Sequence, residues 1–236
     1  MKNFIKTFAV LGLITLFSVS AQAQIKYGVK GGLNLSDIAQ NLKDSDEEMD
    51  TKMRIGYHIG ATVDYTINEK VSLQSGLLLT SKGFKVEDSE SEAGFSADYK
   101  VSGIVNYLEI PVHFAYKIND FQIYAGPYLA FGVGGKFKTE YSLTFNGNTE
   151  SDSDETKLKP VFGEVAEGDL EEDEGAYNAF DYGLNFGIGY QVGPVLLNAG
   201  YSLGLGNFVP KYENSDNEDK VSNRVISVSA TYFFGK

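Results

Sequence analysis

The sequence predicts an all-β fold: an eight-stranded antiparallel up-and-down transmembrane β-barrel of the outer-membrane type, after a signal peptide. Three observations lead to this prediction. After residue 24, apolar and polar residues alternate in eight segments, and short turns alternate with long polar connections between them. The shared apolar face of these segments carries no charged residue. Alternation with a period of two is typical of a strand whose two faces meet different surroundings.

The N-terminal residues have the order of a secretory signal peptide. Two lysines precede an apolar run from Phe8 to Phe17, and an Ala-Gln-Ala sequence ending at Ala23 supplies the expected cleavage site. The apolar run is shorter than the ~20 residues that a membrane helix needs. We therefore expect residues 1–23 to be the signal peptide and residues 24–236 to be the barrel domain.

The first four predicted strands are residues 25–35, 55–67, 71–83 and 107–118. In the first three, the apolar side chains occupy odd positions, and glycine, polar or charged residues occupy the even ones except at Leu78. In the fourth, the apolar side chains occupy even positions from Leu108 onward. Successive side chains of a strand point to opposite faces, so each segment has one apolar and one polar face.

The last four predicted strands are residues 121–131, the two halves of 180–206, and 225–234. Apolar side chains occupy odd positions in 121–131 and even positions from Phe180. The parity changes at Gly193-Pro194, which marks a turn, and the final segment returns to even positions. Each of these four segments therefore also has one apolar face.

The connections between the strands alternate in length. Three are short, and four are long and polar, including a long acidic one at about 138–177. In bacterial outer-membrane barrels the short turns are periplasmic and the long loops extracellular. An even number of strands then places both mature termini in the periplasm. The short connections are 67–70, 119–120 and 193–194, and the other long ones are about 36–53, 85–102 and 209–222.

One long connection carries a pattern of its own. Within the acidic loop, "TEYSLTFNGN" alternates and then reaches Asn146-Gly147. This dipeptide is a strong turn signal between alternating segments. The pattern predicts a hairpin inside the loop.

The charge balance is acidic. Without residues 1–23, which contain two lysines and no acid, 18 basic residues stand against 32 acidic ones. Nucleic-acid binding is therefore not expected, since it needs a basic surface. Acidic runs such as "EDSESE" and "ESDSDE" indicate solvated loops, with divalent-cation bridging to lipopolysaccharide as the alternative. Outer-membrane lipid and lipopolysaccharide are the expected surroundings.

The polar face of the strands carries ionisable residues among many glycines. A soluble protein would place such charges outside, whereas lipid requires an apolar outer face. An eight-stranded barrel has an interior that side chains fill, and an unpaired buried charge is costly. We therefore expect a polar network in the lumen, formed by Lys30, Asp64, Glu109, His113, Lys117 and Asp181.

No catalytic, cofactor or metal site is predicted. The two histidines, His58 and His113, lie on the polar face, and a metal would need further ligands. An enzyme that modifies lipid needs a nucleophile and a base within reach of lipid, and neither histidine lies on the apolar face. The sequence has no cysteine, which excludes disulfides and thiol chemistry.

Three motifs carry a family resemblance. "YGVKGGLNLSDI" (27–38), "NYLEIPVHFAYKI" (106–118) and "YAGPYLAFGVGG" (124–135) together resemble the PorT-like outer membrane β-barrel domain family of Bacteroidetes-type bacteria. The resemblance covers about residues 25–236. It implies an outer-membrane barrel without a catalytic motif and, through the founding group, a link to protein secretion and cell-surface assembly.

The function expected from the sequence is that of an integral outer-membrane protein with a structural or interaction role and no enzymatic activity. A periplasmic or outer-membrane protein is the expected partner. Two alternatives stay open: a narrow gated pore for small solutes, and a lipid-modifying outer-membrane enzyme.

Overall fold

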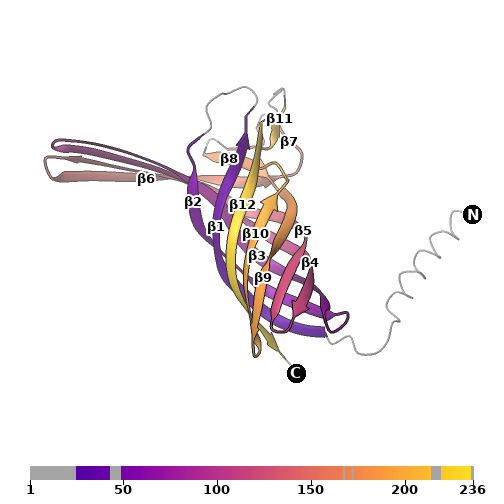
Figure 1. The fold of residues 1–236 in the computed structure, drawn as a ribbon. Coiled ribbons are helices and arrows are strands. Elements are labelled where there is room, and N and C mark those ends of the chain that lie inside the picture. Colours follow the sequence, from indigo (N-terminus) through magenta and orange to yellow (C-terminus); the bar gives the residue numbers. More distant parts are fainter. Residues whose placement is uncertain (1–24, 43–48, 167, 172, 214–218, 235–236) are drawn as a thin grey trace, which may run out of the picture.

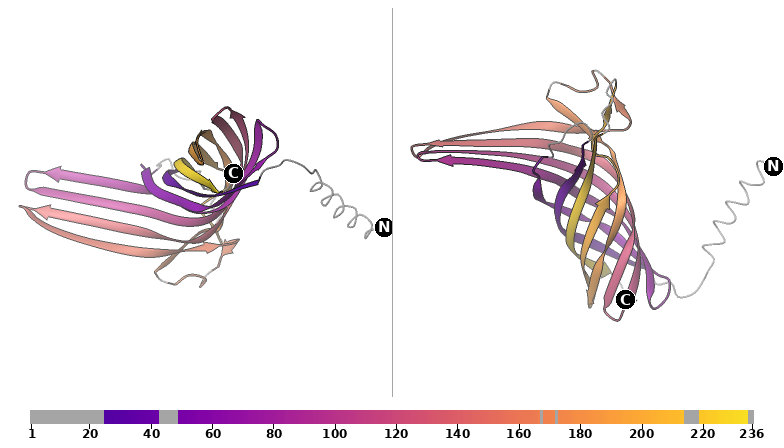
Figure 2. Two further views of the ribbon diagram at one scale, coloured as in Figure 1. Left: turned by 90° about the horizontal axis from the view of Figure 1, so that it is seen from below. Right: turned by 45° about the horizontal axis from the view of Figure 1, so that its top comes forward.

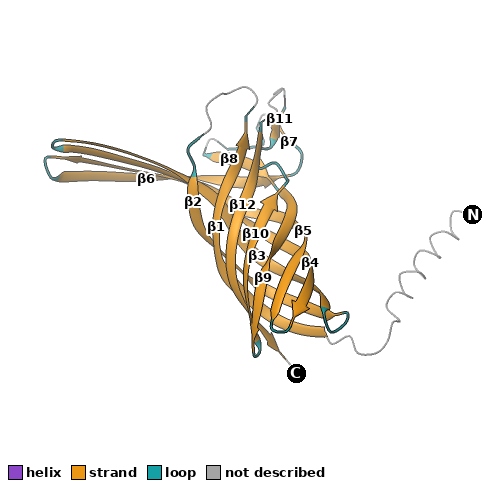
Figure 3. Cartoon of the chain, in the orientation of Figure 1, coloured by secondary structure: helices purple, strands orange, loops and turns teal. Residues whose placement is uncertain are grey.

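The computed structural model describes residues 25–42, 49–166, 168–171, 173–213 and 219–234. The predicted signal peptide, residues 1–23, lies outside these described residues. The described chain consists of strands joined by turns and loops (Figure 3). Within this part of the chain, no helix is long and apolar enough to cross a membrane.

Eight strands of the described chain close into an antiparallel barrel (Figure 1). Each strand pairs with the next around the ring, and the last strand pairs with the first, from Tyr27 opposite Phe234 to Asn41 opposite Lys220. The predicted fold class is confirmed. The ring consists of β1 (Ile25–Asn41), β2 (Lys52–Thr66), β3 (Val71–Glu92), β4 (Phe95–Ile118), β5 (Phe121–Phe145), β9 (Phe180–Val192), β10 (Val195–Gly204) and β12 (Lys220–Phe234).

The alternation in the sequence sets the two faces of the barrel wall. On β9, Phe186 is 45% exposed on the outside, while its neighbour Asn185 is only 7% exposed on the inside. The same division holds on β4, where Phe114 is exposed and His113 is buried. The outside is therefore an apolar band, and the inside is a filled polar lumen.

The short turns share one end of the barrel. Residues 67–70, 119–120 and 193–194 connect neighbouring strands there, and Asn119 and Gly193 adopt the left-handed conformation that tight hairpins need. Ile25 pairs with Tyr65 at this same end, and Phe234, the last described residue, pairs with Tyr27 there. The first and last described residues therefore lie beside the short turns.

At the other end, three strands of the ring continue beyond the barrel and a fourth strand joins them. β3, β4, β5 and β6 (Asn148–Val161) form a sheet that projects sideways, as Figure 2 shows. We call its outer part, residues 85–102 and 136–157, the extension. The prediction of a long polar loop at 85–102 is wrong, because β3 and β4 run paired to a turn at Ala93-Gly94. The hairpin predicted at Asn146-Gly147 is confirmed.

A bulge in β5 keeps the inner face of the extension continuous with the lumen. Asn106 pairs with Gly134, but Tyr107 pairs with Gly132, so Val133 is an extra residue that points outward. Beyond the bulge the parity of β5 is reversed. Phe137 therefore lies on the face that continues the lumen wall.

Short strands cover the open end of the barrel. β8 (Glu174–Asn178) pairs in parallel with β6, and β7 (Glu164–Val165) pairs in parallel with β11 (Lys211–Tyr212). The predicted loop at 138–177 therefore contains ordered strands. β8 brings Tyr177 against the barrel mouth, where its side chain is fully buried.

Candidate functional site in the barrel lumen

A buried lysine lies at the centre of the lumen's charged layer. Lys82 of β3 is 1% exposed, and its Nζ lies 2.8 Å from Glu109 Oε2 and 3.1 Å from Asp181 Oδ2. The Nζ atom also lies 4.3 Å from the centre of the Tyr128 ring, close enough for a cation–π contact. One cation therefore joins β3 to β4 and β9 across the interior.

Asp181 is held by neutral donors as well. The Tyr128 hydroxyl donates to Asp181 Oδ2 at 3.2 Å, and Asn223 Nδ2 donates to the same oxygen at 3.1 Å. A buried carboxylate needs such partners, because desolvation disfavours its charge. The layer thus fixes five strands of the ring, β3, β4, β5, β9 and β12, relative to one another.

A second polar cluster lies nearer the short turns. Lys117 Nζ lies 3.3 Å from Asp64 Oδ2, and this oxygen also accepts hydrogen bonds from Ser72 and Gln74. Gln74 further bonds to Gln122 of β5, two strands away in the ring. The cluster closes this end of the lumen with an ion pair and a chain of amides.

The two histidines lie between these layers. His113 is bonded to Asn185 at 3.1 Å and stacks on the Tyr124 ring, while His58 Nδ1 is bonded to Asn34 at 2.8 Å. They line a cavity of about 40 Å³. A water molecule needs roughly 10–15 Å³ of such volume, so the cavity has room for only a few waters.

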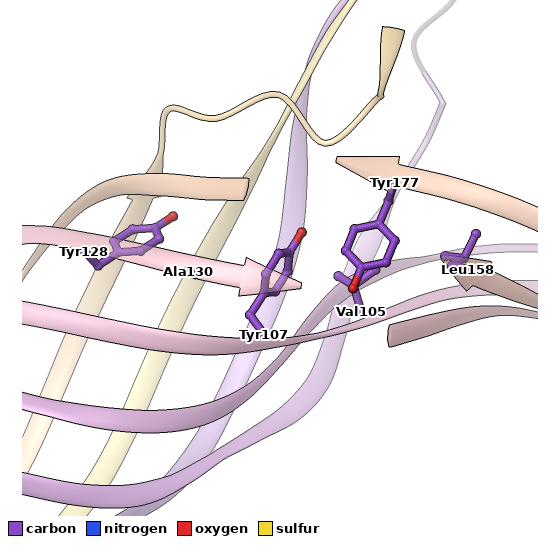
Figure 4. Packing of buried hydrophobic residues seen from close by; sticks show 6 residues of the cluster. All are labelled: Val105, Tyr107, Tyr128, Ala130, Leu158 and Tyr177. Atoms are coloured by element: carbon purple, nitrogen blue, oxygen red, sulfur yellow. The ribbon is translucent and has the colours of Figure 1, made fainter. Parts of the chain in front are cut away.

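Aromatic packing closes the mouth of the barrel above the charged layer. The Tyr107 and Tyr177 rings meet edge to face with their centres 5.8 Å apart, and the Tyr177 hydroxyl accepts a hydrogen bond from the Gly134 amide. Figure 4 shows how β8 carries Tyr177 into this cluster. The cluster consists of Val105, Tyr107, Tyr128, Ala130, Leu158 and Tyr177.

The structure brings five of the six predicted network residues into polar contacts in two layers and between them. Lys117 forms an ion pair with Asp64. Glu109 and Asp181 both contact the Lys82 ammonium, and His113 is hydrogen-bonded to Asn185. Lys30 lines the central cavity but forms no ion pair with a described residue.

The sequence reasoning missed Lys82, the residue that joins Glu109 to Asp181. Its signal was present, because position 82 has the inward parity of β3. The predicted strand included it, but its partners could not be read from parity alone.

The polar groups of the interior mainly contact one another. Among the described residues, no group of three or more histidines or acids is placed to hold a metal ion. The ionisable groups contact one another, and neither histidine is hydrogen-bonded to a hydroxyl that could act as a nucleophile. The arrangement ties the walls of the barrel together.

Comparison with protein families agrees with this architecture. The family model described as "Outer membrane protein beta-barrel domain" matches residues 20–209. The chain belongs to this outer membrane protein beta-barrel domain family. It is therefore a β-barrel protein of the bacterial outer membrane, and its apolar band is the surface that lipid covers. A comparison with curated proteins finds no match.

Several solved structures are similar to this outer-membrane barrel. The attachment invasion locus protein Ail of Yersinia pestis is 14% identical, with 89% of this chain and 98% of that chain covered and a TM-score of 0.36. Neisserial surface protein A is 16% identical, with 88% and 97% covered and a TM-score of 0.38. The toluene transporter TodX of P. putida is 10% identical, with 93% and 92% covered and a TM-score of 0.24. These similarities are weak, and the family assignment rests on the family model.

Proposed function

We propose that this outer-membrane barrel is a structural and interaction protein without enzymatic activity. The observation that supports it is the contrast between the two parts of the molecule. The lumen is filled by the Lys82 layer and the tyrosine cluster, while the extension projects freely from the open end. A filled lumen leaves the ends of the barrel as the surfaces that meet other molecules.

We propose that the extension lies outside the cell and that both mature termini lie in the periplasm. The shared position of the short turns and of both described chain ends supports this orientation, because short turns are periplasmic in bacterial barrels. Outer-membrane lipid and lipopolysaccharide then surround the barrel, and a protein partner can bind at either end.

The resemblance to the PorT-like group supports a finer proposal. If the protein shares that group's role, its partner belongs to a pathway of protein secretion or cell-surface assembly. The Bacteroidetes-type origin is part of the same proposal.

The test is a tagged pull-down from detergent-solubilised outer membranes, with boiled and unboiled eluates compared on a gel. We expect a mobility shift on boiling, typical of a folded barrel, and a stoichiometric partner in the eluate. The matched control is a variant with both hairpins of the extension shortened equally. A folded protein that comes alone from native membranes would contradict the interaction role.

A narrow pore is the second candidate, supported by the small cavities inside the lumen. A cavity of about 20 Å³ adjoins the central one, and both are lined by Lys30 and His113. Planar-bilayer recording separates the two candidates. The interaction role predicts no discrete conductance, whereas a pore predicts conductance steps that change in Glu109→Gln.

The absence of enzymatic activity is tested by mass spectrometry of outer-membrane lipid after overproduction of the protein. We expect no change in the lipid masses.

A further inference from the structure

The extension has one face with an exposed apolar stripe. Residues that pair directly across two strands project to the same side, and Phe95 pairs with Phe145 while Tyr99 pairs with Tyr141. These four side chains are exposed, Phe145 to 64%. With Leu143 they form a stripe along the two central strands, β4 and β5. We call this side of the extension the aromatic face.

Acidic side chains border the stripe on both sides. On β3, Asp88 pairs with Tyr99 and Glu92 pairs with Phe95, so these carboxylates share the aromatic face. On β6, Asp152 pairs with Tyr141 in the same way. The two acidic rows are Asp88, Glu90 and Glu92 on one edge, and Glu150, Asp152 and Asp154 on the other.

The basic residues of the extension all lie on its opposite face. There four of them form ion pairs, such as Lys100 with Glu140 and Lys136 with Glu155. None of the six carboxylates of the aromatic face forms an ion pair with a described residue. A surface that serves only solubility would mix both charges. The segregation instead gives the aromatic face a negative charge that no lysine on that face offsets. The opposite-face lysines are Lys85, Lys100, Lys136, Lys138 and Lys157.

We infer that the aromatic face is the docking site for a basic amphipathic helix of a partner protein or peptide. Three strand spacings separate the acidic rows, or about 14 Å, which accommodates one helix of about 10–12 Å diameter. The stripe from Phe95 to Val101 is about 20 Å long, which about 14 helical residues would cover. The apolar side of the helix would cover the stripe, and its flanking lysines and arginines would reach the two rows.

The charge pattern disfavours other occupants. A second copy packed stripe to stripe would bring acidic rows against acidic rows, because both edges of the face carry the same charge. An anionic membrane surface would be repelled for the same reason. This inference rests on the proposed interaction role and assigns the chemistry of the partner.

The experiment uses the full protein in nanodiscs of zwitterionic lipid and a fluorescent 14-residue peptide of leucine and lysine with helical periodicity. Fluorescence anisotropy measures its binding, with empty nanodiscs as background. The test variant Glu90→Gln/Glu92→Gln/Asp152→Asn neutralises three charges on the aromatic face. Its matched control, Glu87→Gln/Glu140→Gln/Glu155→Gln, neutralises three on the opposite face.

We expect the peptide to bind above background and the test variant to weaken binding about tenfold, as the loss of three exposed ion pairs implies. The control variant should bind as the wild type does. Tyr141→Thr should also weaken binding, because it removes part of the stripe from a strand that tolerates threonine. A gel shift on boiling checks that every variant still folds.

Three results would overturn the inference: binding no greater than to empty nanodiscs, equal loss in both triple variants, or a concentration-dependent dimer that the peptide does not dissociate. The pull-down separates this inference from the proposed function. A native partner that binds the aromatic-face variant normally would refute the inference and leave the interaction role standing. Peptide binding without a native partner would support the inference about the aromatic face and contradict the interaction role.

Discussion

Removing the buried lysine should destabilise the barrel more than any other single loss of charge in the lumen. At an effective dielectric constant of about 20, the 2.8 Å and 3.1 Å contacts of Lys82 each represent about 5–6 kcal/mol of attraction. Most of this offsets the desolvation of three charges. Lys82→Met leaves Glu109 and Asp181 buried without a cation, so we expect the free energy of unfolding to fall by about 3–5 kcal/mol.

The assay is equilibrium unfolding in urea in lipid vesicles, with the folded fraction measured by gel mobility without boiling. Lys117→Met is the control. Lys117 is 27% exposed and the buried Asp64 keeps its Ser72 and Gln74 donors, so we expect a smaller loss of about 1–2 kcal/mol. The triple variant Lys82→Met/Glu109→Gln/Asp181→Asn should recover most of the stability, because all three charges of the layer are removed together. Equal losses in Lys82→Met and Lys117→Met would refute the reasoning.

Three further predictions concern the wall and the extension. Phe186→Arg on the lipid face should cost about 2–4 kcal/mol and reduce assembly, measured by gel shift, whereas Asn185→Arg crowds the lumen without exposing charge to lipid; equal assembly of both would contradict the assigned faces. The Lys138 hydrogen bond lowers the pKa of Glu140 below its ordinary 4.5, so this stabilisation is present above pH 4.5 and is lost as the pH falls through the lowered pKa. Hydrogen exchange in the extension, corrected for intrinsic rates, should show that dependence in wild type but not in Glu140→Gln. Gly147→Val should destabilise the β5–β6 hairpin by about 1 kcal/mol or more, because φ is +83° there, and exchange at its tip should rise while the barrel is unchanged.

The barrel could be predicted from sequence because lipid imposes a strict rule on each strand. Every spanning strand needs an uncharged outer face, so a period of two over about ten residues is enough to assign it. Of the extension, only the hairpin at Asn146-Gly147 was predicted, because the β3–β4 hairpin obeys no such rule. Its alternation, as in Phe95, Ala97, Tyr99 and Val101, is bordered by acidic runs that resemble solvated loop, and only pairing with neighbouring strands turns them into sheet.

The lumen contacts were predictable in kind but not in detail. Parity places a residue inside, yet the partner across the lumen depends on how the strands are staggered around the ring. Lys82 and Asp181 are 99 residues apart, and nothing local relates them. Glu109 illustrates the limit: it shares a strand face with His113 and Lys117, but its ion-pair partner is on β3.

The small diameter of the barrel supports the proposal that its function lies outside the lumen. Eight strands enclose a space that side chains fill, and here Lys82 and the tyrosines fill it, so exchange of solutes would require buried ion pairs to break. The strands that continue beyond the barrel carry no such constraint. The backbone groups of these strands are hydrogen-bonded to the neighbouring strands of the extension. The side chains on their two faces can therefore include residues that folding does not require. An exposed stripe such as Tyr99 and Tyr141 between two unpaired acidic rows is costly to keep in water, and a partner that covers it is the simplest physical reason for its presence.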